Sequence, residues 1–205
     1  MQNFQAQLVK IIDDLTENGY AICEGFLPAP VIKALADVAY ERFAAGEMQV
    51  AKTGKATNVQ QVIYRHDSIY WLDEYSQNTF TQAYFAQIAL LKTALNQQLF
   101  LNLHDFETHL AVYPIGGVYL KHLDQLKPLT DAPTPIRQLS SVLYLNNNWQ
   151  PHEGGELRLH LNAPEYVDIL PNAGRLILFL SAEFWHEVLP ATRSRISLTG
   201  WFRSR

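Results

Sequence analysis

The sequence has little cysteine, no excess of either charge and no long apolar run, and each absence excludes a class of protein. Cys23 is the only cysteine among 205 residues, which excludes an internal disulfide framework and indicates a reducing compartment. A net charge of −4, with no block of like charges, argues against a general nucleic-acid binder. No apolar segment has the length of a membrane span, and the first residues lack the pattern of a signal peptide. We therefore expect a cytoplasmic protein with no membrane or nucleic-acid partner.

The chain also lacks a linker, an internal repeat and any low-complexity tract, and this predicts a single domain over residues 1–205. Hydrophobic residues make up 48% of the chain, which is ample material for one core. The sequence pattern changes near the middle, so residues 1–106 and 107–205 are expected to form different parts of that domain.

Residues 1–106 are predicted to be a helical support. Apolar residues recur at helical spacing in three segments, at about 4–18, 30–46 and 78–99. The segment at about 48–68 has no helical period and is predicted to be a polar loop or finger, followed by a short strand near residues 69–72.

Residues 107–205 are predicted to be a succession of strands. The helical period disappears, and turn signals separate segments rich in Val, Ile, Leu and aromatic residues. These segments are ETHLAVYPI, VYLKHLDQL, RQLSSVLYLNN, GELRLHL, RLILFLS, FWHEVLPA and SRISLTGWF. About seven or eight short strands in succession predict a sandwich or barrel, and helices followed by strands predict the α+β class.

One predicted strand, YLKHLDQL at residues 119–126, carries a histidine and a carboxylate on the same face. Side chains alternate along a strand, so His122 and Asp124 point the same way, between two leucines. With a third ligand from a neighbouring strand, they would form the facial triad of the non-haem Fe(II) oxygenases. His186, in FWHEVLP, is the candidate third ligand. The same spacing fits a buried His–Asp hydrogen bond or simply a surface strand, and as a signal for a metal it is weak, so the pattern alone leaves the choice open.

Arg195 and Tyr144 add a second chemical feature to this part of the chain. Arg195 follows His186 by nine positions and belongs to the next predicted strand, which would place its guanidinium deep in the same cavity. A planar guanidinium suits a carboxylate, which it can hold by two parallel hydrogen bonds, and the Tyr144 hydroxyl could donate a further one. The alternative is an arginine at the edge of a sheet.

These motifs resemble the catalytic core of the Fe(II)/2-oxoglutarate dioxygenases, specifically prolyl hydroxylases of the type that modifies hypoxia-inducible factor. The resemblance lies in VYPIGGVYLKHLD, RQLSSVLYLNNNW, EGGELRL, HEVLPA and RISLTGWF. Upstream, YRHDSIYWLDE resembles the mobile loop of that family and the strand after it. The resemblance covers over half of the chain. It implies a double-stranded β-helix (jelly-roll) core at residues 107–205 with N-terminal supporting helices.

The resemblance implies Fe(II), 2-oxoglutarate as co-substrate and O2, and it suggests ascorbate binding. The expected reaction is hydroxylation of a prolyl residue, at C4, in a protein substrate, with release of succinate and CO2. The chain looks most like the bacterial members of the family, which suggests elongation factor Tu as the partner. Two alternatives stay open: an oxygenase of this family that acts on a free amino acid or other small molecule, and a non-catalytic jelly roll that binds a ligand or partner.

The resemblance also gives roles to individual residues. The iron ligands, and with them the catalytic centre, would be His122, Asp124 and His186. The cofactor-binding residues would be Arg195, Tyr144, Tyr113, Thr199 and Trp201, with Trp201 also near the target proline. The substrate-binding residues would be Tyr119, Arg137, Asp67 and Arg65. We further expect an Asp67–Arg137 ion pair that couples the loop to the substrate. His66 stands where the loop of the family has glycine, which restricts the backbone there.

Overall fold

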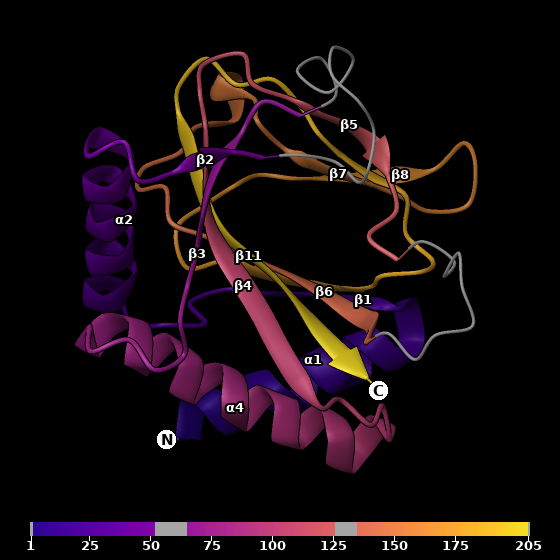
Figure 1. Ribbon diagram of the computed structural model, residues 1–205. Helices are drawn as coiled ribbons and strands as arrows, with labels where there is room; N and C mark the ends of the chain where they lie inside the picture. Colours follow the sequence, from indigo (N-terminus) through magenta and orange to yellow (C-terminus); the bar gives the residue numbers. More distant parts are fainter. Residues whose placement is uncertain (1, 52–64, 126–134, 205) are drawn as a thin grey trace.

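The computed structural model describes residues 2–51, 65–125 and 135–204 (Figure 1). Within them lie three α-helices, α1 (Gln2–Asn18), α2 (Ala29–Ala44) and α4 (Thr79–Leu99), and a short 3-10 helix, η1 (Pro151–Glu153). The α-helices agree with the predicted helical segments to within two residues at each end. No helix in the described residues is long and apolar enough to cross a bilayer.

The helices begin and end where local chemistry requires it. In α1, Leu8, Ile11 and Leu15 are buried and recur every three or four residues, so they lie on one face. Gly19, at φ +75°, ends this helix in a conformation that glycine adopts without strain. The side chain of Asn78 accepts hydrogen bonds from two backbone N–H groups at the start of α4, and such a cap contributes about 1 kcal/mol.

The strands of the described chain form two antiparallel sheets. The larger has seven strands in the order β1-β9-β6-β11-β4-β3-β2, and the smaller has four in the order β5-β10-β7-β8. The strands of the larger sheet are β1 (Tyr20–Cys23), β9 (Leu176–Leu180), β6 (Ile136–Tyr144), β11 (Arg195–Ser204), β4 (Asp105–Tyr113), β3 (Ser68–Trp71) and β2 (Gln49–Val50). The strands of the smaller sheet are β5 (Tyr119–His122), β10 (His186–Val188), β7 (Leu157–His160) and β8 (Tyr166–Ile169).

The seven-stranded sheet separates two hydrophobic cores. Its outer face packs on the helices, which lie together on one side of it in Figure 1. Its inner face packs against the smaller sheet. Strand β6 shows how the two-residue period divides its side chains: Leu139 and Leu143 join the helical core, whereas Val142 and Tyr144 join the core between the sheets. The inner face is therefore where polar residues of the long strands can meet those of β5 and β10.

Several strand boundaries differ from those expected from the sequence. β5 ends at His122, although the alternating pattern continues to residue 126, so Asp124 lies outside the strand. β8 was not among the predicted segments, because its alternate residues Tyr166 and Asp168 are exposed and leave only a short apolar pattern. The predicted finger at about 48–68 contains β2, and its residues 52–64 lie outside the described part of the chain.

Candidate metal centre and its pocket

Pairing of β5 with β10 brings the two candidate histidine ligands together. His122 and His186 are direct partners in the antiparallel register. Asp124 follows β5 and turns toward them: its Oδ1 is 3.7 Å from His122 Nε2, and its Oδ2 is 3.5 Å from His186 Nε2. One donor atom from each of the three residues lies within 4.8 Å of the others. Two imidazole nitrogens and a carboxylate at these separations fit one divalent ion about 2 Å from each donor, with further positions open.

The protonation states of the ligands suit a metal. Burial, and then the neighbouring His186, lowers the pKa of His122 to about 3, so its imidazole is neutral at pH 7. His122 Nδ1 lies 2.7 Å from the backbone oxygen of Leu120, which can only accept, so Nδ1 carries the proton and Nε2 keeps a free lone pair. Burial alone would raise the pKa of Asp124, but the two imidazoles and the Ser140 hydroxyl outweigh it and lower that pKa.

The same pocket contains an unpaired buried cation. Arg195 is 3% exposed, and Nη1 donates to the Gly155 carbonyl at 3.2 Å and to the Tyr144 hydroxyl at 3.4 Å. The guanidinium lies 4.4 Å from the centre of the Tyr113 ring. Within the described residues it forms no ion pair, and its Nε has no hydrogen-bond partner. Because an unpaired charge is expensive to bury, this arrangement fits an anionic ligand that pairs with Arg195 when bound.

The phenols beside Arg195 are held in their neutral form. Burial raises the pKa of both Tyr113 and Tyr144. A neutral phenol can donate a hydrogen bond, so Tyr144 can contribute a donor to the same anion as Arg195.

Ten of the twelve residues predicted for the site line a single cavity of about 40 Å³ between the two sheets. They are Arg65, Tyr113, Tyr119, His122, Asp124, Tyr144, His186, Arg195, Thr199 and Trp201. The sequence prediction omitted the apolar residues of this lining, Val142, Leu157 and Val188. The alternation of side chains along a strand could have predicted two of them. Val142 is two residues from Tyr144 and Val188 is two residues from His186, so each shares a strand face with a predicted site residue.

Asp67 and Arg137 lie outside that lining, and the predicted ion pair between them is wrong. Asp67 is fully buried and accepts two hydrogen bonds from Arg65, at 2.5 and 2.7 Å. Arg137 instead donates to Glu107 at 2.9 Å and lies over the Trp201 ring at 3.5 Å. Each residue pairs with a different partner within hydrogen-bond distance: Asp67 with Arg65, two residues earlier in the chain, and Arg137 with Glu107.

Arg65 connects this segment to the metal centre. Its guanidinium lies 4.7 Å from the centre of the Tyr119 ring, and that ring stacks on His122 with centroids 3.6 Å apart and an interplanar angle of 16°. Arg65 Nη2 is also 3.4 Å from His109 Nε2. His109 is 1% exposed and packs against the rings of Trp71 and Trp201. Tyr119 and its neighbours thus form the wall beside the candidate ligand His122.

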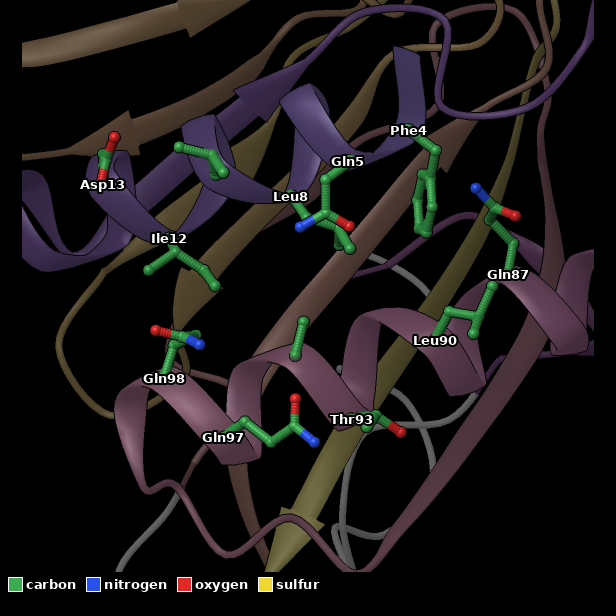
Figure 2. A pocket seen from close by; sticks show the side chains of 12 residues that line it. Phe4, Gln5, Leu8, Ile12, Asp13, Gln87, Leu90, Thr93, Gln97 and Gln98 are labelled. Carbon is green, nitrogen blue, oxygen red and sulfur yellow. The ribbon is translucent and has the colours of Figure 1, made fainter. Parts of the chain in front are cut away.

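A larger hollow lies elsewhere, in the groove between α1 and α4 (Figure 2). It has a volume of about 720 Å³, and among the described residues that line it Asp13 is the one ionisable residue. The remaining lining residues are Phe4, Gln5, Leu8, Val9, Ile12, Gln87, Leu90, Thr93, Ala94, Gln97 and Gln98. The described residues place no cluster of ligating or nucleophilic groups in this groove, so it is not the candidate for chemistry.

Similarity to known proteins agrees with the geometry of the smaller pocket. Residues 108–203 match the model of the 2OG-Fe(II) oxygenase superfamily. A crystal structure of a Pseudomonas putida prolyl-4-hydroxylase is 44% identical, with a TM-score of 0.85 over 97% of this chain and 99% of that one. A Trichoplax adhaerens prolyl hydroxylase, solved with a hypoxia-inducible factor peptide, is 25% identical, with a TM-score of 0.85 over 99% of this chain and 91% of that one.

A third relative is much longer than this chain. Rat Egl nine homolog 1 is 34% identical over 96 residues, which are 45% of this chain and 27% of the rat protein. The match thus spans about a quarter of that relative.

The chain belongs to the 2OG-Fe(II) oxygenase superfamily. Membership in this superfamily confirms the predicted α+β class with a jelly-roll core. It also confirms the prediction that the protein is an enzyme that uses Fe(II), 2-oxoglutarate and O2. The three-residue cluster could hold a metal ion, and the unpaired Arg195 has the chemistry to bind a carboxylate.

Proposed function

We propose that this protein is a prolyl hydroxylase that acts on a protein substrate, at C4 of the proline ring, with elongation factor Tu as the candidate substrate. The observation that carries the proposal is that His122, Asp124, His186 and an unpaired Arg195 line one pocket. The prolyl substrate is supported by the similarity, over nearly the whole chain, to a protein described as a prolyl-4-hydroxylase. Elongation factor Tu follows from the sequence resemblance to bacterial members.

Each side chain of the pocket has a distinct task in this proposal. His122, Asp124 and His186 hold Fe(II), which with 2-oxoglutarate and O2 supplies the oxidising chemistry and yields succinate and CO2. Arg195 pairs with the far carboxylate of 2-oxoglutarate and so fixes its orientation. The Tyr144 hydroxyl, 3.4 Å from Arg195 Nη1, donates to the same carboxylate.

The remaining pocket residues shape and close the site. Tyr113 and Thr199 line the co-substrate side. Trp201 and Tyr119 present aromatic surfaces beside the metal ligands, where a proline ring can pack while water is excluded.

Two arginines complete the substrate side of the pocket. Arg137 packs on the Trp201 ring and contacts substrate from outside the cavity. Arg65, held by Asp67, supports the Tyr119 ring. Ascorbate, which would keep the iron reduced, is part of the proposal as a reductant.

The test is an in-vitro hydroxylation assay. The protein is loaded anaerobically with Fe(II) and 2-oxoglutarate, then incubated in air with purified elongation factor Tu and, separately, with proteins of a bacterial lysate. Mass spectrometry should find one oxygen atom added to a single proline. His122→Ala should abolish the modification and weaken metal binding, yet keep the circular dichroism of the folded protein, because it removes a ligand from a pocket wall and not from either core.

Other outcomes would reassign the protein. Metal and 2-oxoglutarate binding with no modified protein, but turnover with a free amino acid, would indicate a small-molecule oxygenase. A protein that binds neither metal nor 2-oxoglutarate would be a non-catalytic jelly roll. Full turnover by His122→Ala would remove His122 from the ligand set.

A further inference from the structure

The two histidine ligands and the aspartate are held in place by different means. His122 Nδ1 is 2.7 Å from the carbonyl of Leu120, and His186 Nδ1 is 3.1 Å from the carbonyl of Phe184. Each imidazole therefore donates to a backbone carbonyl two residues earlier, which fixes its ring and points Nε2 into the pocket. Both histidines also belong to paired strands, so the hydrogen-bond ladder fixes their backbones.

Asp124 has neither support. It lies beyond the end of β5, and within the described residues no ladder bond holds its backbone. Two contacts replace them. The neighbouring Gln125 donates its N–H to the carbonyl of Ser181 at 3.1 Å, and the Asp124 side chain accepts a hydrogen bond from Ser140 Oγ at 2.7 Å, on Oδ2.

The two serines form a short chain of hydroxyls behind the carboxylate. Ser140 is 1% exposed in the middle of β6, Ser181 is fully buried just after β9, and their Oγ atoms are 2.8 Å apart. A carboxylate can only accept, so the Ser140 proton points to Asp124, and Ser140 must in turn accept from Ser181. The direction of donation is thus Ser181 to Ser140 to Asp124.

We propose that Ser140 and Ser181 are positioning residues for the metal ligand Asp124. Their hydrogen bond engages Oδ2 and orients the carboxylate, so that Oδ1 is left for the ion. They do for Asp124 what a backbone carbonyl does for each histidine. This inference rests on the proposed function, because it takes the three-residue cluster to be the iron site.

β6 supplies a matched control at the next position. Ser141 is also fully buried, but it lies on the opposite face of the strand, and its hydroxyl has no hydrogen-bond partner in the described part of the chain. Ser140→Ala and Ser141→Ala thus delete the same atom at adjacent buried positions, and only the first deletion reaches Asp124.

The experiment is an anaerobic titration with Co(II), a redox-stable probe whose absorption spectrum reports the ligand geometry. Ser140→Ala should weaken Co(II) binding by about 10- to 100-fold, the usual cost of losing a partner of a metal ligand, and should change the spectrum. Ser181→Ala should weaken binding less, because Ser140 keeps its bond to Asp124. The variant Ser140→Thr keeps a hydroxyl at this position, so it should have the Co(II) affinity and spectrum of the wild type. The control variant Ser141→Ala should also match the wild type.

Thermal unfolding separates positioning from a merely structural role. If the serines only stabilise the fold, Ser140→Ala lowers the melting temperature equally with and without Co(II), and the inference is overturned. If they position Asp124, the stabilisation by Co(II) is itself reduced. Wild-type affinity and spectrum in both Ser140→Ala and Ser181→Ala would also overturn the inference. A wild-type protein that binds no Co(II) would overturn the proposed iron site as well.

Discussion

The pocket between the sheets is much smaller than the groove between α1 and α4, but it contains many more ionisable side chains. The groove has a volume of about 720 Å³, and Asp13 is the one ionisable residue among the described residues of its lining. The pocket has about 40 Å³, yet it gathers two arginines, two histidines, an aspartate and three tyrosines. Volume alone would thus point to the groove. Buried ionisable groups with shifted pKa values and an unpaired charge point to the pocket.

The difference has a structural cause. The α1–α4 groove lies on the outside of the helical layer, where Gln5, Gln87, Gln97 and Gln98 can satisfy their amides with water (Figure 2). The pocket lies between two sheets, where polar side chains must find partners within the protein or in a ligand. Arg195 without an ion pair is therefore informative, whereas a solvent-exposed glutamine without a partner is not.

The largest effect is expected at Arg195, in the pocket. Arg195→Met should weaken 2-oxoglutarate binding by ~2–5 kcal/mol, which is roughly 30-fold to several thousand-fold, because the ligand carboxylate loses its buried partner. Without ligand, the same change should leave the free energy of unfolding unchanged or raise it, since it removes an unpaired buried charge. Calorimetric titration with Mn(II) present, and thermal unfolding without 2-oxoglutarate, measure the two effects.

Arg158 supplies the control for this experiment. Its guanidinium is already paired with Asp168 at 2.7 Å, on the smaller sheet and outside the pocket lining. Arg158→Met should leave 2-oxoglutarate affinity at the wild-type value. Unchanged affinity in Arg195→Met would remove Arg195 from its proposed role.

An intermediate effect is expected in the pH dependence of stability. Burial, then the charges of Arg65 and Arg137, lowers the pKa of His109 from 6.5 to about 3. Between these values the unfolded chain binds a proton that the folded protein excludes, so His109 makes stability fall as the pH drops from 6.5 toward 3. The slope for one such group is up to ~1.4 kcal/mol per pH unit.

The variant His109→Gln tests this contribution of His109 to the pH dependence, and its amide oxygen remains available as an acceptor for Arg65. In urea unfolding between pH 7 and pH 4, the free energy of unfolding should fall less steeply with falling pH in the variant. The difference in slope should correspond to the uptake of up to one proton fewer on unfolding. His122 contributes equally to both proteins and cancels in the difference. Parallel curves for variant and wild type would mean that His109 takes up its proton in the folded state.

The smallest effect is expected in the groove. Leu90 is 55% exposed there, and Leu90→Gln should change the free energy of unfolding by no more than ~0.5 kcal/mol. Metal and 2-oxoglutarate affinities should stay at wild-type values in the same titrations used for Arg195. A clear loss of affinity in Leu90→Gln would contradict the assignment of ligand binding to the pocket alone, because it would show that the groove also affects it.

The sequence predicted buried faces correctly where apolar residues recur at a regular spacing and pack against the core. Leu8, Ile11 and Leu15 lie buried on one face of α1, as their spacing predicts. The pattern was misleading at Asp124, because alternation continues past the end of β5, where the hydrogen-bonded ladder stops. The predicted Asp67–Arg137 pair failed for a related reason: a sequence does not rank competing partners, and Arg65 and Glu107 are closer.

The sequence alone predicts the α+β class, because helical and strand periods are local patterns. The pattern of side chains left the metal centre open, and the resemblance to the Fe(II)/2-oxoglutarate dioxygenases supplied its candidate residues and the arginine for a carboxylate. The folded structure was needed to show which histidines face each other, that Arg195 has no ion pair in the described chain, and that Ser140 and Ser181 form a hydrogen-bonded chain to Asp124. These depend on strand register and on distances between residues far apart in the chain, and no local pattern records them.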